Sequence, residues 1–274
     1  MNYKELWHRL TVLYDADEAK ALVRWVLDVH FGLSWADILC GKVSELSPDL
    51  QEELLQIMLR LEQGEPVQYI IGVADFYGRQ FHVAPGVLIP RPETSELCRW
   101  ILEGEAAKTI LDIGTGSGCI AITLALEMPE AKVLAWDISD EALHIARQNA
   151  QTFGADVLFE KRDALNISLT SQYDLIVSNP PYIKPQERDE MAKNVLDYEP
   201  EQALFAPEDD PIIFYECIGE YAWKCLKSGG LLFFELNPLT VEDVRRYLLQ
   251  FGFSDIEIRH DQYGKQRFLK AKKI

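Results

Sequence analysis

The sequence of 274 residues predicts an α/β fold, in which a doubly wound and mostly parallel sheet follows a small all-α N-terminal domain. From Thr109 onward, short runs of β-forming residues alternate with helical patterns, as in a parallel sheet. Before about residue 72, apolar residues recur at helical spacing and no run indicates a strand. The two stretches differ in architecture, and we expect each to form its own domain.

Residues 1–72 are expected to form a bundle of three or four short helices. Leu6 and Leu10 lie one helical turn apart and begin an apolar stripe. Ser47 precedes Pro-Asp and an apolar repeat, which is typical of a helix start, and Gly64 is expected to end that helix. We expect this domain to provide a docking surface for a substrate and no catalytic chemistry.

A change in composition marks the boundary between the domains. Residues 73–92 are rich in glycine, proline and alternating aromatic residues, which predicts a hairpin or an extended connector. Residues 93–274 form the larger domain. Two strands at its end, 255–260 and 267–270, are close enough in sequence to pair as an antiparallel hairpin at one edge of the sheet. The other expected strands are 109–113, 132–136, 156–160, 173–178 and 231–236, and the expected helices are 119–127, 139–153, 212–226 and 241–250.

Composition limits the possible partners. The net charge of −17 is spread over both domains, whereas a protein that grips duplex nucleic acid normally offers a positive surface. No apolar run approaches the roughly 18 residues of a membrane span, and the N-terminus has no signal-peptide core, so we expect a cytoplasmic protein. The five cysteines include no CxxC pair and are expected to be reduced. The five histidines show no metal-binding spacing, and no metal is expected.

A glycine-rich turn joins the first predicted strand to the helix that follows it. Glycines at alternate positions let the backbone turn tightly and approach a ligand closely. Asp137 ends the next strand, nineteen residues after the turn, where a carboxylate can accept hydrogen bonds from both hydroxyls of a ribose. We therefore predict a nucleoside-containing cofactor, bound by Asp137 and by the turn residues Gly114, Thr115, Gly116, Ser117 and Gly118.

Two classes of cofactor, and a purely structural turn, compete as explanations of this pattern. The fingerprint of nicotinamide dinucleotides has its third glycine one residue later, where this chain has Cys119. No other feature for a pyrophosphate is present. S-Adenosyl-L-methionine is therefore the favoured cofactor, and a structural strand-to-helix turn is the alternative.

A second motif, Asn179-Pro180-Pro181-Tyr182, follows the predicted buried strand 173–178. If this is the fourth strand, it neighbours the first, and the crevice between them is where open α/β sheets bind ligands. Two successive prolines fix the backbone, so the Asn179 side-chain oxygen and the Pro180 carbonyl can accept both hydrogens of a substrate NH₂ group. Tyr182 offers a flat face to a planar group. The motif predicts methyl transfer to a planar amide or amino nitrogen, against the alternative of a plain strand-ending turn.

With both motifs in place, the chain closely resembles the protein-glutamine N5-methyltransferases of peptide-chain release factors (the PrmC/HemK family) over essentially its full length. The proline-rich stretch that ends in Ile-Pro-Arg-Pro-Glu-Thr is more specific to these enzymes than Asn-Pro-Pro-Tyr, which adenine-N6 methyltransferases share. The segments that carry the resemblance are 65–72, 76–78, 85–94, 112–118, 179–182 and 198–200.

The resemblance implies a class I S-adenosylmethionine-dependent methyltransferase with a seven-stranded sheet, a β-hairpin linker at 73–92 and a helical N-terminal domain. It implies methylation of the glutamine of a Gly-Gly-Gln motif in release factors. It assigns the cofactor to residues 114–118 and Asp137, with Asn179 beside it, and the glutamine amide to residues 179–182, which would form the catalytic site. Ala164 would contact the adenine. The chain departs from the family pattern at Ser95, Asn237 and Thr240.

Several other residues have weaker assignments. Arg91 and Glu93 could position the substrate or form an ion pair that holds the linker. Glu199 could line the pocket entrance, although a solvated loop acid is slightly favoured. Trp25, Trp35 and Trp100 are expected to fill core positions.

Other functions stay open at the level of sequence. An adenine-N6 methyltransferase on DNA or RNA would flip a base into the same pocket, and a related enzyme methylates a glutamine of a ribosomal protein. A non-catalytic cofactor-binding scaffold is the alternative outside enzymes. We expect release factors as the protein substrate, no stable binding of nucleic acid, no membrane association and a monomer.

Overall fold

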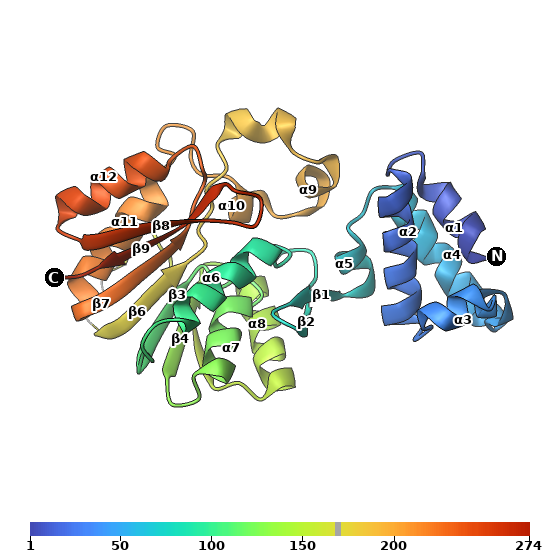
Figure 1. The fold of residues 1–274 in the computed structure, drawn as a ribbon, viewed down its shortest axis with the longest axis horizontal. Coiled ribbons are helices and arrows are strands. Elements are labelled where there is room, and N and C mark those ends of the chain that lie inside the picture. Colours follow the sequence, from blue (N-terminus) through green and yellow to red (C-terminus); the bar gives the residue numbers. More distant parts are fainter. Residues whose placement is uncertain (168–170) are drawn as a thin grey trace. The chain divides into compact units, whose positions relative to one another are not determined.

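The structure, a computed structural model, describes residues 1–167 and 171–274 (Figure 1). The chain forms two compact units. The first combines Met1–Val73 with Ala192–Tyr198, and the second combines Ala74–Met191 with Glu199–Ile274. Within the described ranges, no helix is both long enough and apolar enough to cross a membrane.

The first unit is helical. Its longest helix is α4, where the Ser47 hydroxyl accepts a hydrogen bond from the Leu50 N–H at 3.4 Å. Gly64, just beyond the end of that helix, has a φ of 82° in the left-handed region. The described part of the unit has more helices than the three or four expected, because α3 and α5 span only five residues each and leave no apolar period to detect. The helices are α1 (Tyr3–Leu10), α2 (Ala16–Trp25), the π-helical turn η1 (Val26–His30), α3 (Trp35–Leu39), the 3₁₀ turn η2 (Lys42–Glu45), α4 (Pro48–Glu62), α5 (Val67–Ile71) and α9 (Lys193–Tyr198).

Buried leucines, isoleucines and valines from α1, α2 and α4 form the core of this unit. Of the three tryptophans expected in core positions, Trp100 is buried in the second unit, and Trp25 is partly buried. The prediction for Trp35 is wrong, since this side chain is 39% exposed. Its ring contacts the edge of Tyr3 and lies 4.8 Å from the Arg24 guanidinium carbon, so it packs on the surface of the bundle.

The second unit contains the seven-stranded sheet expected for a class I methyltransferase fold. Its strand order is β5-β4-β3-β6-β7-β9-β8, parallel except at β9, which pairs antiparallel with both β7 and β8. The hairpin predicted at the end of the chain is therefore present. The short strands β1 (Val73–Phe76) and β2 (Arg79–His82) form a separate two-stranded sheet. The strands of the large sheet are β3 (Thr109–Ile113), β4 (Lys132–Asp137), β5 (Val157–Lys161), β6 (Tyr173–Ser178), β7 (Leu226–Glu235), β8 (Ser254–His260) and β9 (Gln266–Lys272).

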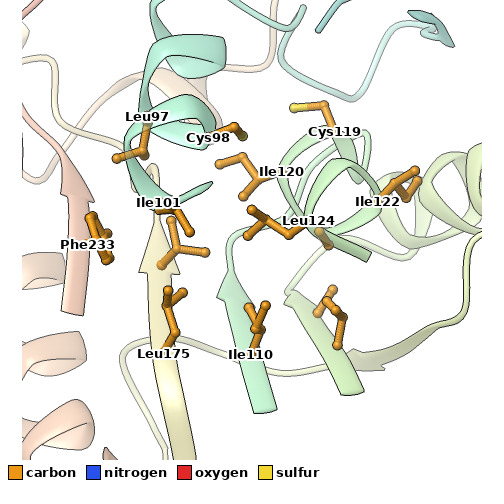
Figure 2. Close-up of a cluster of buried hydrophobic side chains, with 14 of the residues drawn as sticks. Leu97, Cys98, Ile101, Ile110, Cys119, Ile120, Ile122, Leu124, Leu175 and Phe233 are labelled. Carbon is orange, nitrogen blue, oxygen red and sulfur yellow. The ribbon is translucent and has the colours of Figure 1, made fainter. Parts of the chain in front are cut away.

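Helices cover both faces of this sheet. Alternate residues of the buried strands point to opposite faces: Ile110 of β3 joins one apolar cluster and Leu111 joins the other. Figure 2 shows the first cluster, where side chains such as Leu97, Ile120 and Phe233 from α6, α7 and β7 meet over the strands. The helices of this unit are α6 (Pro92–Leu102), α7 (Cys119–Glu127), α8 (Asp140–Phe153), the 3₁₀ turn η3 (Pro185–Glu190), α10 (Glu201–Leu204), α11 (Ile213–Cys225) and α12 (Val241–Phe251).

The short helical segments η3, α9 and α10 lie where no helix is predicted, and two longer elements also differ from the sequence-based expectation. Helix α6 lies where no helix is predicted, and its proline stands in the first helical turn, where proline costs no hydrogen bond. Strand β7 begins at Leu226, well before the predicted start at residue 231. The intervening Ser-Gly-Gly resembles a turn, but Gly229 adopts a φ of 79° and the pairing with β6 shifts register there. The strand thus continues through an irregularity.

Candidate active site

The two predicted motifs meet at the carboxyl ends of neighbouring strands. Ile113, the last residue of β3, is paired with Ser178, the last residue of β6. Gly114 and Asn179 therefore leave the sheet side by side, and a Cβ added to Gly114 would lie 4.0 Å from the Asn179 carbonyl oxygen. A pocket of about 280 Å³ lies at these strand ends. It is lined by Gly86, Val87, Leu88, Ile113, Gly114, Gly116, Asp137, Ile138, Ser139, Ala142, Arg162, Asp163, Ala164, Leu165, Ser178, Asn179, Pro180, Pro181, Gln202, Ala203, Phe214 and Ile218.

The three glycines of the turn share a left-handed backbone but have different surroundings. Gly114, Gly116 and Gly118 have φ values of 75°, 55° and 82°. An added Cβ at Gly116 would meet no atom within 4 Å, whereas at Gly118 it would lie 2.9 Å from Ile122 Cδ1 and 3.1 Å from Ala146 Cβ. Gly116 faces open space at the pocket, and Gly118 lets α7 and α8 pack closely.

Thr115 and Ser117 are buried and do not line the pocket. The Thr115 hydroxyl donates to Asp112 Oδ2 at 2.6 Å, and the Ala121 N–H donates to the same oxygen at 3.2 Å. Burial raises the pKa of Asp112 to about 7, against the opposing effect of these two donors. These residues therefore stabilise the turn from its buried side and do not form the pocket surface.

Asp137 lies at the end of β4 and lines the pocket. Its Oδ2 accepts the Gly116 N–H at 2.8 Å, and its Oδ1 accepts the Ser139 N–H at 2.9 Å. Burial raises the pKa of this carboxyl, and the backbone donors partly oppose the rise. Each carboxylate oxygen can accept a further hydrogen bond, so the side chain fits a ligand with two adjacent hydroxyls.

Asn179 lines the pocket, and its Nδ2 donates to the Thr94 hydroxyl at 3.3 Å. The Tyr182 hydroxyl donates to Glu235 Oε1 at 3.1 Å, and Tyr182 itself is not a lining residue. The Asn237 amide donates to the Tyr182 carbonyl at 3.0 Å. Asn237, which was expected to depart from the family pattern, thus holds the end of the Asn-Pro-Pro-Tyr turn through this hydrogen bond.

Glu199 differs from the favoured prediction of a solvated loop acid. Its side chain is 1% exposed and forms an ion pair with Arg91 at 2.6 Å. Its second oxygen accepts the Ile89 N–H at 3.1 Å. The carboxylate holds the segment just before α6, so Arg91 forms the structural ion pair that the sequence offered as one of two possibilities. Ala164, by contrast, does line the pocket, beside Asp163.

Sequence reasoning assigned no role to three buried polar residues around the site. Thr94 lies inside the proline-rich motif, and Glu235 directly follows the apolar run 231–234 of β7, which is a signal that could have been used. Asn149 on α8 donates to the Ser117 carbonyl at 2.9 Å and accepts the His82 N–H at 2.7 Å. It joins the glycine turn to the β1–β2 hairpin.

Comparison with known proteins identifies the family. Residues 93–204 match the model of the methyltransferase small domain, and residues 8–72 match the model of the PrmC N-terminal domain. A release factor glutamine methyltransferase from Bacteroides thetaiotaomicron is 48% identical over 263 residues, which cover 94% of each chain. The chain belongs to the release factor glutamine methyltransferase family.

A second family member, the release factor glutamine methyltransferase from Flavobacterium psychrophilum, is 38% identical over 284 residues, covering 98% of both chains. The resemblance inferred from the motifs is therefore confirmed. Among solved structures, a methyltransferase from Pyrococcus furiosus matches with a TM-score of 0.54 and 18% identity, covering 83% of this chain and 99% of that one. At this identity the likeness establishes the fold alone, and it agrees with the predicted class.

Proposed function

We propose that this enzyme methylates the side-chain amide nitrogen (N5) of the glutamine in the Gly-Gly-Gln motif of peptide chain release factors, with S-adenosyl-L-methionine as methyl donor. One observation carries the proposal. The glycine turn after β3 and the Asn-Pro-Pro segment after β6 line the same pocket, and they lie on neighbouring strands. Methyl transfer needs donor and acceptor held in one geometry, and adjacent strand ends provide that arrangement.

The pocket residues fit S-adenosylmethionine. Asp137 has acceptor capacity left for the two ribose hydroxyls, and Gly116 leaves open space beside it. Ile138 and Leu165 are 53% and 40% exposed and line the pocket, so they offer apolar surface to a flat base next to Ala164. When bound, the cofactor supplies an electrophilic methyl group on a sulfonium ion. Gly114, Gly116, Asp137, Ala164 and Asn179 would contact it, while Thr115, Ser117 and Gly118 would shape the turn.

The Asn-Pro-Pro-Tyr turn would hold the substrate. The Asn179 side-chain oxygen and the Pro180 carbonyl would accept the two hydrogens of the glutamine NH₂, and Pro181 would keep that carbonyl in place. An amide nitrogen is a poor nucleophile because its lone pair is shared with its carbonyl. Holding the NH₂ group at one angle, with acceptors for the charge that develops on it, lowers the barrier without a strong base. The Tyr182 ring, fixed through its hydroxyl to Glu235, would stack on the planar amide.

The decisive experiment is transfer of a radiolabelled methyl group to a purified release factor. We expect the wild-type enzyme to label it, and a release factor with alanine in place of the Gly-Gly-Gln glutamine to stay unlabelled. Equal labelling of both would overturn the assigned substrate. Labelling of a ribosomal protein or of adenine in preference to the release factor would favour one of the alternative functions.

The catalytic assignment has its own test in Asn179→Ala. This variant should keep its fold and most of its cofactor affinity, while single-turnover methylation falls about 100- to 1000-fold, as when one preorganised acceptor is lost. Asn179→Asp, which keeps an acceptor but adds a negative charge, should bind the cofactor at least as well and remain badly impaired. A rate within about threefold of wild type in Asn179→Ala would show that this residue only forms a turn.

We further propose that the enzyme acts as a monomer in the cytoplasm, where its substrate acts, and forms no stable complex with nucleic acid. The net charge of −17 supports the last point. Residues 1–72 would dock the protein substrate, with residues 73–92 as linker and 93–274 as the catalytic domain. Sedimentation of the purified enzyme with and without duplex DNA tests both the oligomeric state and the absence of binding.

A further inference from the structure

A chain of hydrogen bonds runs behind the pocket from Asn179 to the end of β7. Asn179 Nδ2 donates to Thr94 Oγ1 at 3.3 Å, and the Thr94 hydroxyl donates to Glu235 Oε2 at 2.7 Å. Thr94 and Glu235 are 2% and 1% exposed, so water does not compete for these contacts. Neither residue lines the pocket. Their contacts with the site pass through Asn179 and Tyr182.

The directions of the hydrogen bonds in this chain follow from the ionised form of Glu235. An ionised carboxylate only accepts hydrogen bonds. The second oxygen of Glu235 accepts the Tyr182 hydroxyl at 3.1 Å. Burial raises the pKa of Glu235, and the Thr94 hydroxyl, the positive charge of Arg267 and the Tyr182 hydroxyl oppose the rise. Both hydroxyls donate to this carboxyl group, as its ionised form requires. Thr94 has a single hydroxyl proton and gives it to Glu235, so its oxygen can only accept from Asn179.

This order decides which edge of the Asn179 amide faces the substrate. If the amide were flipped, its oxygen would meet a threonine oxygen with no proton to offer. The NH₂ group of Asn179 must therefore point at Thr94, and Oδ1 is the atom left for another donor. A glutamine NH₂ group needs an acceptor there, and the flipped amide would present it with two more N–H groups.

We propose that Thr94 is a positioning residue for methyl transfer, which, held by Glu235, locks the Asn179 amide with its oxygen available to the glutamine NH₂ group. This inference rests on the proposed function and adds a residue that acts only through Asn179. The part that matters is the hydroxyl of Thr94, and not its bulk.

Four variants test this role: Thr94→Val, which keeps the shape and removes the hydroxyl, Thr94→Ser, which keeps the hydroxyl, Asn179→Ala and the double variant Thr94→Val/Asn179→Ala. Single-turnover methylation of a release factor is measured together with the affinity for S-adenosylmethionine and the KM for the release factor. We expect Thr94→Val to lower the rate about 10- to 100-fold, the effect of one lost hydrogen bond to a critical group, with both binding constants within about threefold. Thr94→Ser should stay within about threefold of wild type.

The double variant separates positioning from a structural effect. If Thr94 acts through Asn179, the valine causes no further loss once Asn179 is alanine. An equal loss in both backgrounds, a loss in Thr94→Ser as large as in Thr94→Val, or a normal rate in Thr94→Val would each overturn the proposal. If Thr94→Val does not bind the cofactor, Thr94→Ala is compared with Thr94→Ser instead, because these two differ in the hydroxyl. The single-turnover rate of Thr94→Ala should then be lower than that of Thr94→Ser by the same factor of about 10 to 100. A defect in Asn179→Ala beside a normal Thr94→Val would leave the proposed function standing and overturn only the role of Thr94.

Discussion

Two glycines of one turn are expected to fail in different ways when replaced by alanine. Gly116 and Gly118 both have a positive φ, so an alanine at either position carries a backbone strain of about 1–2 kcal/mol. Only at Gly118 would the new methyl group also be crowded, at 2.9 Å from Ile122 Cδ1 and 3.3 Å from the Ala146 Cα. Overpacking of this kind costs a further 1–3 kcal/mol or so.

Gly118→Ala should therefore destabilise the second unit by about 2–5 kcal/mol, and Gly116→Ala by about 1–2 kcal/mol. Cofactor affinity should show the opposite order, with the larger loss in Gly116→Ala and the smaller loss in Gly118→Ala. Gly116 lines the pocket, so its methyl group would occupy ligand space, and we expect affinity to fall at least about tenfold, as for a misplaced contact group. The folded fraction of Gly118→Ala should bind within about threefold of wild type.

The assay pairs thermal unfolding, followed without cofactor, with calorimetric titration of S-adenosylmethionine. Each kcal/mol is expected to shift the midpoint by about 2–4 °C for a unit of this size. Gly154→Ala is a matched control, because Gly154 has a φ of 64°, open space around its Cβ and no place in the pocket. It should match Gly116→Ala in stability and wild type in affinity. Equal affinity losses in Gly116→Ala and Gly118→Ala would refute the separation of roles.

Three further predictions concern the cofactor carboxylate, the docking domain and the ion pair between Arg91 and Glu199. Asp137→Asn should weaken S-adenosylmethionine binding by about 1–3 kcal/mol. Burial raises the pKa of Asp137, so the affinity of the wild-type enzyme for S-adenosylmethionine should fall as the pH drops. This fall should begin at a higher pH than for an ordinary carboxyl group. If Asp137→Asn shows the same fall, the titrating group is Asp112 instead. Deleting residues 1–72 should raise KM for a whole release factor and leave cofactor affinity intact, and an unchanged KM would end the docking role. Glu199→Ala should lower stability by about 1–3 kcal/mol in thermal unfolding, since Arg91 loses its buried partner, with partial recovery in Glu199→Gln, and an unfolding curve like that of wild type would contradict this.

Elements of the fold that depend on local patterns could be predicted from the sequence. The strands β3 and β6 and the helix α7 have the predicted bounds, because mainly apolar runs end there at Gly114, at Asn179-Pro180 and at Glu127. Helix α6 escaped prediction, since its proline-rich entry resembles a connector. The start of β7 was also missed, because Ser228-Gly-Gly resembles a turn. A bulge lets the strand continue through these residues with a shift of register against β6.

The site could be predicted where one short segment contains the functional residues, as in the glycine turn and in Asn179. The buried residues that form hydrogen bonds behind Asn179 could not be predicted. Thr94 and Glu235 are 141 positions apart and meet only because the start of α6 packs beside the end of β7. Glu199 was misjudged for the same reason: its acceptor role for Ile89 links residues 110 positions apart. No local pattern records such contacts.

The first unit is discontinuous in sequence, because the chain contributes two separate segments to it. The short segment Ala192–Tyr198 belongs to it, and there the Tyr198 hydroxyl donates to the Gln63 carbonyl at 3.2 Å. The very next residue, Glu199, is buried in the second unit beside Arg91. A chimera that exchanges only Met1–Val73 between two relatives would pair a foreign bundle with a native segment. Helical units of this family should therefore be transplanted as two pieces, with the Gln63 and Tyr198 partners taken from the same parent.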